Sequence, residues 1–417
     1  MPSWSDYSTG ERIKILRGKQ ISQEQLAAMT DLAPATIQAA EQDRRLTLQT
    51  LMKISAALGA DISVIEGQQP PRRAMDQDDR TMVRALSAAV HDTAAGILPE
   101  AAEPATLDDL QRATDRCWHL YWRGRYTEAG ATVTPLLVAA AATLRDRPAG
   151  DQSPAWGAVS DAYRIAAYVA NLVGVRDLAY AAIGHARNAA EKSDDGLRPA
   201  LVDSGRAWVY LRDARLEDAV RLAEKAAMDI EPRFSRATPD ELTVYGSHVN
   251  FAAVVASRKG DKARAADYLS QSNATGARMG AEHRAHGTLF GPVTATTQAV
   301  GINVAMGQTG KALTLIQSIT EGEDGDTARL TEAARNRYAM DKAMAQADAK
   351  MWDASLTTLE DALRASPEWA RHQTLPGVIA EKVGRQSNAR LARVSKLIGV
   401  RTPVDSGFAA ADRRTAL

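Results

Sequence analysis

Residues 21–41 read ISQEQLAAMTDLAPATIQAAE, and they predict two short helices joined by a tight turn. Ser22 is a favourable N-cap for the first helix, and Gln25 three residues later completes a capping box. Pro34 suits the first position of the second helix, because an N–H at that position has no helical partner anyway. Two short helices with this spacing are typical of a helix-turn-helix.

The flanking segments complete a small helical domain. Aliphatic residues at helical spacing mark one helix before the pair and one after it: Ile13 and Leu16, then Leu48, Leu51, Ile54 and Leu58. Glycine commonly ends a helix, and Gly18 and Gly59 follow these two segments. Four or five short helices around one aliphatic core predict a domain over residues 9–67, and a domain of about 60 residues can fold alone.

Residues 10–67 resemble the lambda-repressor-like (XRE-type) helix-turn-helix domains of bacterial transcription regulators. Three stretches carry the resemblance: SQEQLA at 22–27, the pair Thr36–Ile37 followed by Glu41, and LQTLMKISAALGADI at 48–62. The resemblance implies that the second helix enters the major groove of double-stranded DNA.

The same resemblance implies which side chains contact DNA. Mapped by motif, the base-reading positions are Pro34, Ala35, Gln38 and Ala39. Gln38 can read adenine through two hydrogen bonds, and the alanines can meet thymine methyl groups. Phosphate contacts are expected from Gln23, Thr36, Arg44 and Arg45. The alternative is a degenerate helix-turn-helix that serves only as a packing or docking module, because three of the four base-reading positions lack a hydrogen-bonding side chain.

The charge of the chain restricts how it binds DNA. The 417 residues carry a formal net charge of zero, and residues 1–67 hold seven Lys or Arg against eight Asp or Glu. Non-specific attraction to phosphate is therefore weak, and affinity has to come from locally placed cations and from dimerisation.

A short signature recurs after residue 106 and predicts helical hairpins. Each copy is a small or turn residue followed by alanine five positions later, and the copies begin at Gly124, Gly174, Ala214, Gly260, Gly307 and Ala349. The expected hairpins cover residues 107–144, 154–192, 198–230, 239–279, 292–320 and 327–365, followed by a last helix over 379–398. A hairpin cannot bury its apolar side alone, so such units stack. They resemble tetratricopeptide repeats in a lengthened form.

The predicted fold is all-α, with no convincing strand: a lambda-repressor-like bundle followed by a tetratricopeptide-like solenoid. The expected boundaries are 9–67 for the DNA-binding domain, 68–106 for a linker with a connecting helix, 107–399 for the repeats and 400–417 for a disordered tail. This layout is similar to that of peptide-pheromone regulators of Gram-positive bacteria and of a set of actinobacterial regulators. The alanine- and arginine-rich composition is closer to the actinobacterial set.

The first helix of each hairpin is expected to face the concave side of the solenoid, where a peptide or small-molecule effector would bind. Candidate ligand-binding residues there are Tyr168, Asn171, Tyr245, His248, Asn250, Asn303 and Tyr338, together with Tyr163 and Trp208. In the peptide-sensing relatives, asparagines on such a face hold the peptide backbone. The alternative is that these aromatic and polar residues pack between hairpins.

Several other classes of protein are disfavoured. Cys117 is the one cysteine, so no intramolecular disulfide forms, and the polar N-terminus and the lack of a long apolar run indicate a cytoplasmic protein without a membrane segment. The segment from Gly307 imitates a P-loop but has Ala312 where Ser or Thr holds Mg²⁺. His283 and His286, expected on one helix, are too few for a metal site. We expect no catalytic residues, metal or cofactor.

These observations predict a transcriptional regulator that binds DNA as a homodimer formed through its repeat domain. Two heads at a fixed spacing bind an operator more tightly than one, because the second contact becomes intramolecular. The alternative function is a protein-interaction scaffold whose helix-turn-helix no longer reads DNA.

Overall fold

The computed structural model describes residues 4, 7–18, 21–44, 46–58, 60–67, 77–321, 327–384, 394 and 397–398. Over these residues the chain is helical apart from one short β-hairpin, so the all-α prediction is confirmed. Arg45, residues 68–76 of the expected linker and the expected tail 400–417 lie outside the described part.

The described part of the N-terminal domain, called the head below, contains five helices: α1 (Thr9–Arg17), α2 (Gln23–Thr30), α3 (Pro34–Glu41), α4 (Leu48–Leu58) and α5 (Ile62–Ile65). The predicted capping box at Ser22 and Gln25 is present, and a second one caps α1 through Ser8 and Glu11. Ile13, Leu26, Ile37, Leu51 and Ile65 form the core and are fully buried. The head therefore has the helix-turn-helix arrangement that the sequence predicts.

The rest of the described chain, called the body, contains one leading helix, six helix pairs and two closing helices. In chain order these are α6 (Gln77–Ala94); α7 (Leu107–Trp122) and α8 (Tyr126–Asp146); α9 (Ser153–Leu172) and α10 (Arg176–Ala190); α11 (Arg198–Arg212) and α12 (Leu216–Met228); α13 (Pro239–Lys259) and α14 (Lys262–Met279); α15 (Pro292–Ala305) and α16 (Thr309–Glu321); α17 (Glu332–Asp348) and α18 (Trp352–Ala365); α19 (Pro367–Arg371) and α20 (Leu375–Gly384). Short 3₁₀ turns lie at Ala149–Asp151 and Thr327–Arg329.

The recurring signature marks the reversal inside each helix pair. In the first five pairs the turn residue has a positive φ, and the alanine five positions later is fully buried against the partner helix. The sixth pair differs from the prediction by one residue. Its positive φ (61°) falls on Lys350 instead of Ala349, and Ser355 instead of Ala354 takes the fully buried position.

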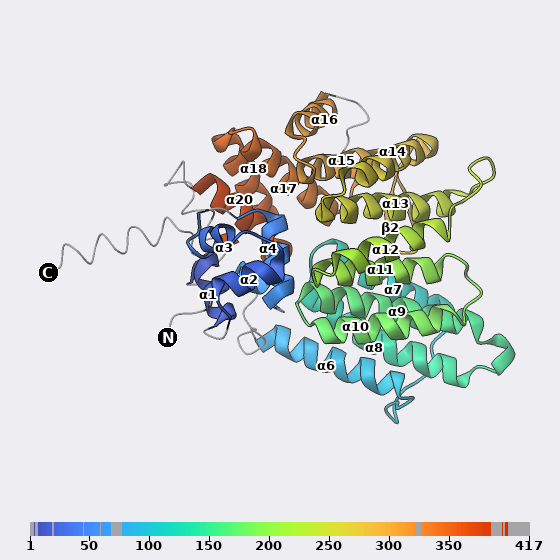
Figure 1. Cartoon of the computed structure of the whole chain (residues 1–417). Helices are drawn as coiled ribbons and strands as arrows, with labels where there is room; N and C mark the ends of the chain where they lie inside the picture. The colour runs from blue at the N-terminus through green and yellow to red at the C-terminus, as the bar shows by residue number, and fades with distance from the viewer. Residues whose placement is uncertain are drawn as a thin grey trace.

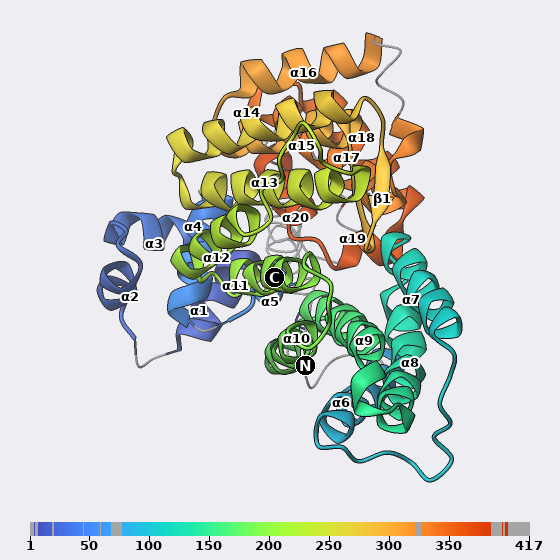
Figure 2. The same cartoon turned by 90° about the vertical axis from the view of Figure 1, so that its right-hand side faces the viewer.

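Successive pairs pack side by side and curl into a ring. The first helices α7, α9, α11, α13, α15 and α17 pack on one another in that order. The ring closes where α17 contacts α7 and where the Tyr126 and His372 rings lie 5.3 Å apart. At the same place Gly124 lies so close to Trp369 that a Cβ atom added to the glycine would be 2.5 Å from the Trp369 side chain. Figure 2 shows α7 beneath α17, α18 and α19. The first helices of the pairs therefore surround a common interior.

The helix expected as a connection belongs to this packed body. Met82, Leu86 and Val90 of α6 are buried, and α6 packs against α8, α9 and α10 along the lower edge of Figure 1. By length and composition α8 is apolar enough to cross a membrane, but 44% of its apolar window is buried in the fold, and it packs between α6, α7 and α9.

A β-hairpin corrects two predictions. Strands β1 (His283–Ala285) and β2 (Thr288–Phe290) pair antiparallel between α14 and α15, where no strand and a helical pair of histidines were expected. His286 and Gly287 at the turn have φ values of 50° and 72°. Two successive positive φ values form a tight turn whose twist matches that of the paired strands. Such backbone angles cannot continue a right-handed helix.

The predicted last helix, 379–398, lies only partly within the described residues, and residues 379–384, 394 and 397–398 are helical. Two helices, α19 and α20, follow the sixth pair; α20 begins at Leu375, four residues before the predicted start, and packs on α17 and α18. Most residues beyond 384 lie outside the described part.

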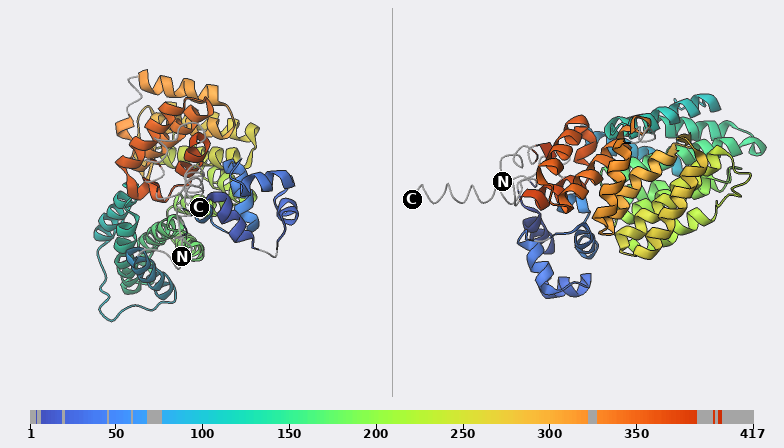
Figure 3. Two further views of the ribbon diagram at one scale, coloured as in Figure 1. Left: turned by 90° about the vertical axis from the view of Figure 1, so that its left-hand side faces the viewer. Right: turned by 90° about the horizontal axis from the view of Figure 1, so that it is seen from above.

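The head lies against one side of the body, with α4 and α5 toward it. Figure 2 shows α2 and α3 on the outer side of the head, and Figure 3 shows the head projecting from the body in two further views. An ion pair between Asp61 at the start of α5 and Arg176 at the start of α10 joins the two parts. The side chain of Gln49 in α4 approaches Gly260. Among the described elements, α3 packs extensively only on helices of the head.

Candidate functional sites

The exposed face of α3 is the first candidate site. Pro34, Ala35 and Gln38 are exposed, and Thr36 and Ala39 are partly exposed beside them. Ile37 and Ala40 on the opposite face are buried in the head. The helix-turn-helix fold therefore presents the predicted base-reading positions together on one outward surface.

The predicted phosphate-binding residues near this face differ in their exposure and in their hydrogen bonds. The exposed side chain of Arg44 follows α3 directly, whereas Arg45 lies outside the described residues. The Gln23 amide donates to Glu41 Oε2 at 2.7 Å. The same carboxylate accepts from Arg17 Nε at 2.5 Å, and this bond raises the Arg17 pKa. Glu41 therefore fixes Gln23 at the start of α2 and neutralises a nearby cation.

A cavity of about 440 Å³ inside the ring is the second candidate site. Its wall comes mainly from the first helix of each pair, which is the side that the sequence predicts to be concave. Further lining comes from β2, from the segment around α19 and α20, and from four residues of the head: Leu48, Met52, Asp61 and Ile62. A volume of this size is typical of small-molecule sites.

Aromatic side chains are concentrated in this cavity. The chain has only four phenylalanines, seven tryptophans and ten tyrosines, and nine of these rings line the cavity: Trp118, Tyr121, Trp122, Tyr126, Tyr168, Trp208, Phe251, Phe290 and Trp369. Trp118 stacks on Trp122 with a centroid distance of 5.8 Å, and Tyr168 meets Trp208 edge to face at 5.1 Å. The rings hold one another in place before any ligand enters.

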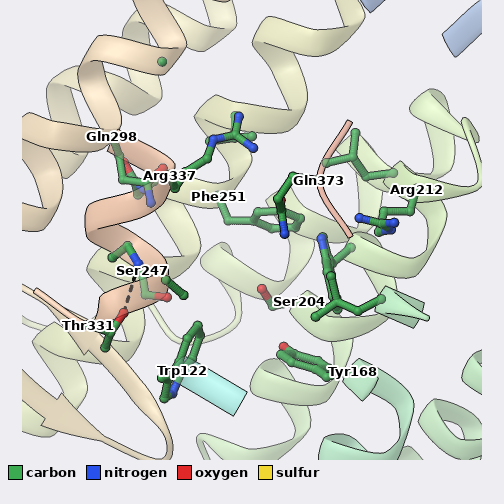
Figure 4. Close-up of a pocket in the computed structure, with 18 of the residues that line it drawn as sticks. Trp122, Tyr168, Ser204, Arg212, Ser247, Phe251, Gln298, Thr331, Arg337 and Gln373 are labelled. Atoms are coloured by element: carbon green, nitrogen blue, oxygen red, sulfur yellow. Dashed lines mark hydrogen bonds between the residues drawn. The ribbon is translucent and has the colours of Figure 1, made fainter. Parts of the chain in front are cut away.

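Cations also gather at the cavity wall. Arg164, Arg212, Arg258 and Arg337 line it, against the carboxylates of Asp61 and Asp341. Figure 4 shows Arg337 and Arg212 entering from opposite sides, with Phe251 and Gln373 between them. Burial lowers the pKa of Arg212, and burial together with Arg337 lowers the pKa of Arg258 to about 10. Both guanidinium groups are poorly solvated.

The β-hairpin forms one wall of the cavity and is attached to the far side of the ring. Trp122 Nε1 donates to the Gly287 carbonyl at 3.1 Å, and Arg164 donates to the His286 carbonyl at 2.7 Å. A Cβ on Gly287 would lie 2.4 Å from the Trp118 ring. The hairpin tip is therefore fixed by α7 and α9, far from its own place in the sequence.

Only some of the predicted ligand-binding residues line the cavity, and the others contact different parts of the fold. Tyr168, Asn250 and Trp208 line the cavity. Tyr163 contacts Thr93, Tyr338 packs among aliphatic residues of α15 and α16, and Asn303 donates to the Ala299 carbonyl. The Tyr245 hydroxyl points to Gln271, and His248 lies between two backbone carbonyls, where burial lowers its pKa. Asn171 is fully buried in α9, and its amide atoms have no hydrogen-bond partner among the residues that the structure describes.

The sequence alone does not point to Arg212, Arg258 or the hairpin. A single arginine in an arginine-rich chain gives no signal, because its role depends on which helices the ring brings together. Within the described part of the chain, no three His, Cys, Asp or Glu side chains gather as a metal site. Cys117 is buried, and burial raises its thiol pKa to about 12, so it is a poor nucleophile.

Comparison with known proteins identifies the head alone. Residues 13–65 match a family described as helix-turn-helix. No curated protein and no solved structure matches the chain. A domain of this family supports a DNA-binding regulator in general, and such domains are not typically catalytic.

Proposed function

We propose that this chain is a sequence-specific, DNA-binding transcriptional regulator that acts inside the cell. The observation that supports this proposal best is the outward face of α3. Gln38 and Arg44 are both exposed, and α3 lies on the outer side of the head in Figure 2. A recognition helix held in this way can enter a major groove without unfolding any part of the body.

In this proposal the residues have separate roles. Gln38 reads a base, Ala35 and Ala39 contact thymine methyl groups, and Arg44 with Thr36 binds phosphate. Gln23 contacts phosphate at the start of α2, next to Glu41 that holds it. Pro34 positions the first turn of α3. A single head with these few contacts binds weakly, so we propose a homodimer formed through the body.

The body would act as a sensor of the tetratricopeptide type. Its cavity touches the head directly, since Leu48, Met52, Asp61 and Ile62 form part of the wall. A ligand in the cavity would therefore contact the surface that holds the head in place. Binding energy that differs between two head positions is what shifts their populations.

The competing proposal is a protein-interaction scaffold. It is supported by the low positive charge around α3, where Arg17 is neutralised by Glu41 and the Lys53 ammonium points to a backbone carbonyl. The two proposals differ in the expected response to salt, because phosphate contacts make DNA binding strongly salt-dependent.

The test is selection of bound duplexes from a random-sequence pool with the full-length protein, followed by footprinting and light scattering. A regulator yields an enriched, pseudo-palindromic site and a dimer on that site. A pool without an enriched sequence, together with no salt-dependent retention on DNA, would favour the scaffold.

A further inference from the structure

We propose that the cavity binds a small organic anion with a flat apolar body, and that Arg212 supplies the main counter-charge. This inference deepens the proposed function, because such a molecule would be the effector. The structure supports it through the charge balance of the wall, the burial of one guanidinium and the arrangement of the rings.

Two arginines of the wall have no carboxylate partner among the described residues. Arg164 pairs with Asp161 at 3.3 Å, and Arg337 pairs with Asp341 at 3.0 Å. Among the carboxylates of the wall, Asp61 is occupied by Arg176. Neither Arg212 nor Arg258 forms an ion pair with any described carboxylate, so the wall carries uncompensated positive charge facing the interior.

Arg212 is the less well satisfied of the two. Its Nε and Nη2 atoms are buried and have no hydrogen-bond partner in the described part of the chain, and its guanidinium carbon lies 6.0 Å from the Trp208 ring centroid. Arg176 is a further positive neighbour, since the charge of Arg212 helps to lower the pKa of Arg176. A buried cation without a partner is costly, and an anion that enters the cavity removes that cost.

The rings define the rest of the ligand. Trp122, Tyr168 and Trp208 line the same cavity as Arg212, and Figure 4 shows Trp122 and Tyr168 at the bottom of the view, below Arg212. Offset or edge-to-face contacts with such rings favour a planar molecule over an aliphatic chain. A volume of about 440 Å³ suits a small molecule, whereas an extended peptide of eight residues needs a groove more than 25 Å long.

The test is calorimetry with matched pairs of probes on the full-length protein. The pairs are 2-naphthoate with 2-naphthamide and indole-3-acetate with indole-3-acetamide, which differ in charge but hardly in shape. We expect at least one carboxylate to bind at least about 10-fold more tightly than its amide, because a charge-assisted contact in a buried site contributes this much. Equal affinities within both pairs, or no binding by either carboxylate, would overturn the proposal.

Two variants identify the residue. Arg212→Gln is expected to abolish the preference for the carboxylate. Arg221 is an exposed arginine of α12, and Arg221→Gln is expected to preserve the preference. Without a ligand, Arg212→Gln is expected to raise the melting temperature, because it removes an uncompensated buried charge. A lower melting temperature would show that Arg212 stabilises the fold, and would overturn its assignment as a ligand-binding residue.

This experiment is independent of DNA. If the protein binds no DNA but prefers the carboxylates, this inference holds and the proposed function is wrong. If the protein selects a DNA site but binds acid and amide with equal affinity, the proposed function holds and this inference is wrong.

Discussion

Asp61 of the head and Arg176 of the body form an ion pair at the edge of the cavity. Both side chains are largely buried, with exposed fractions of 11% and 13%. Asp61 also caps α5 by accepting from the Ser63 N–H. The head and the body are therefore joined at a residue that the ligand site and the helix-turn-helix domain share.

Asp61→Asn is expected to loosen the head without unfolding it. Asparagine preserves the N-cap of α5 but removes the charge that pairs with Arg176, at a cost of about 1.5–3 kcal/mol. Hydrogen exchange of the α4 and α5 amides should become faster, while that of the body stays the same. Asp229→Asn breaks an exposed pair with Lys225 and serves as the control, with an effect within about 0.5 kcal/mol. Equal exchange in both variants would show that the ion pair does not hold the head.

The buried carboxyl of Glu66 is expected to make stability depend on pH. Burial and then the nearby Glu381 raise its pKa to about 8, although Arg12 acts in the opposite direction. The folded state therefore holds a proton that the unfolded state releases near the ordinary pKa of 4.5. Stability falls as pH rises from about 5 to 8, by up to about 1.4 kcal/mol per pH unit.

Glu66→Gln removes the carboxyl that binds this proton. The free energy of unfolding in urea should therefore depend less on pH in the variant than in the wild type between pH 5 and 8. The variant should also be the more stable of the two at pH 8. Glu103→Gln replaces an exposed carboxylate and should leave the pH profile unchanged. If Glu66→Gln has the same pH profile as the wild type, Glu66 is ionised in the fold.

The tip of the β-hairpin is expected to tolerate no side chain larger than hydrogen. Gly287→Ala puts a Cβ against Trp118 at a residue whose φ is 72°, so it adds a steric clash to the backbone strain. Gly96→Ala is the matched control, because Gly96 has φ of 74° and open space around it. We expect about 1 kcal/mol of destabilisation for Gly96→Ala and at least about 1 kcal/mol more for Gly287→Ala. Similar losses in the two variants would mean that the hairpin tip is free to move away from α7.

Local sequence signals predicted the helices and their pairing well. The capping box at Ser22 and the recurring turn glycines each fix a reversal within a few residues, and the observed helix pairs begin and end close to the predicted hairpins. The sixth pair is shifted by one residue because Lys350, and not Ala349, takes the left-handed conformation at the turn. Nothing in the local sequence distinguishes these two choices.

Long-range features could not be predicted in this way. The closure of the ring joins α7 to α17, and the β-hairpin reaches α7 and α9 from a position more than 100 residues away. Such contacts depend on the summed curvature of all six pairs. The expected concave residues Tyr168 and Asn250 reach the cavity, but its arginines become recognisable only when burial and missing partners are seen.

The central claim is that α3 reads DNA, and it is tested most directly by titrating the full-length protein onto its selected site and onto a scrambled duplex at several salt concentrations. We predict that Gln38→Ala weakens binding to the selected site by about 5–100-fold and leaves the scrambled duplex unaffected. Arg44→Ala should weaken both and reduce the salt slope by about one, while Arg221→Gln changes neither. Unchanged binding in both the Gln38 and Arg44 variants would contradict the assignment of this chain as a DNA-reading regulator.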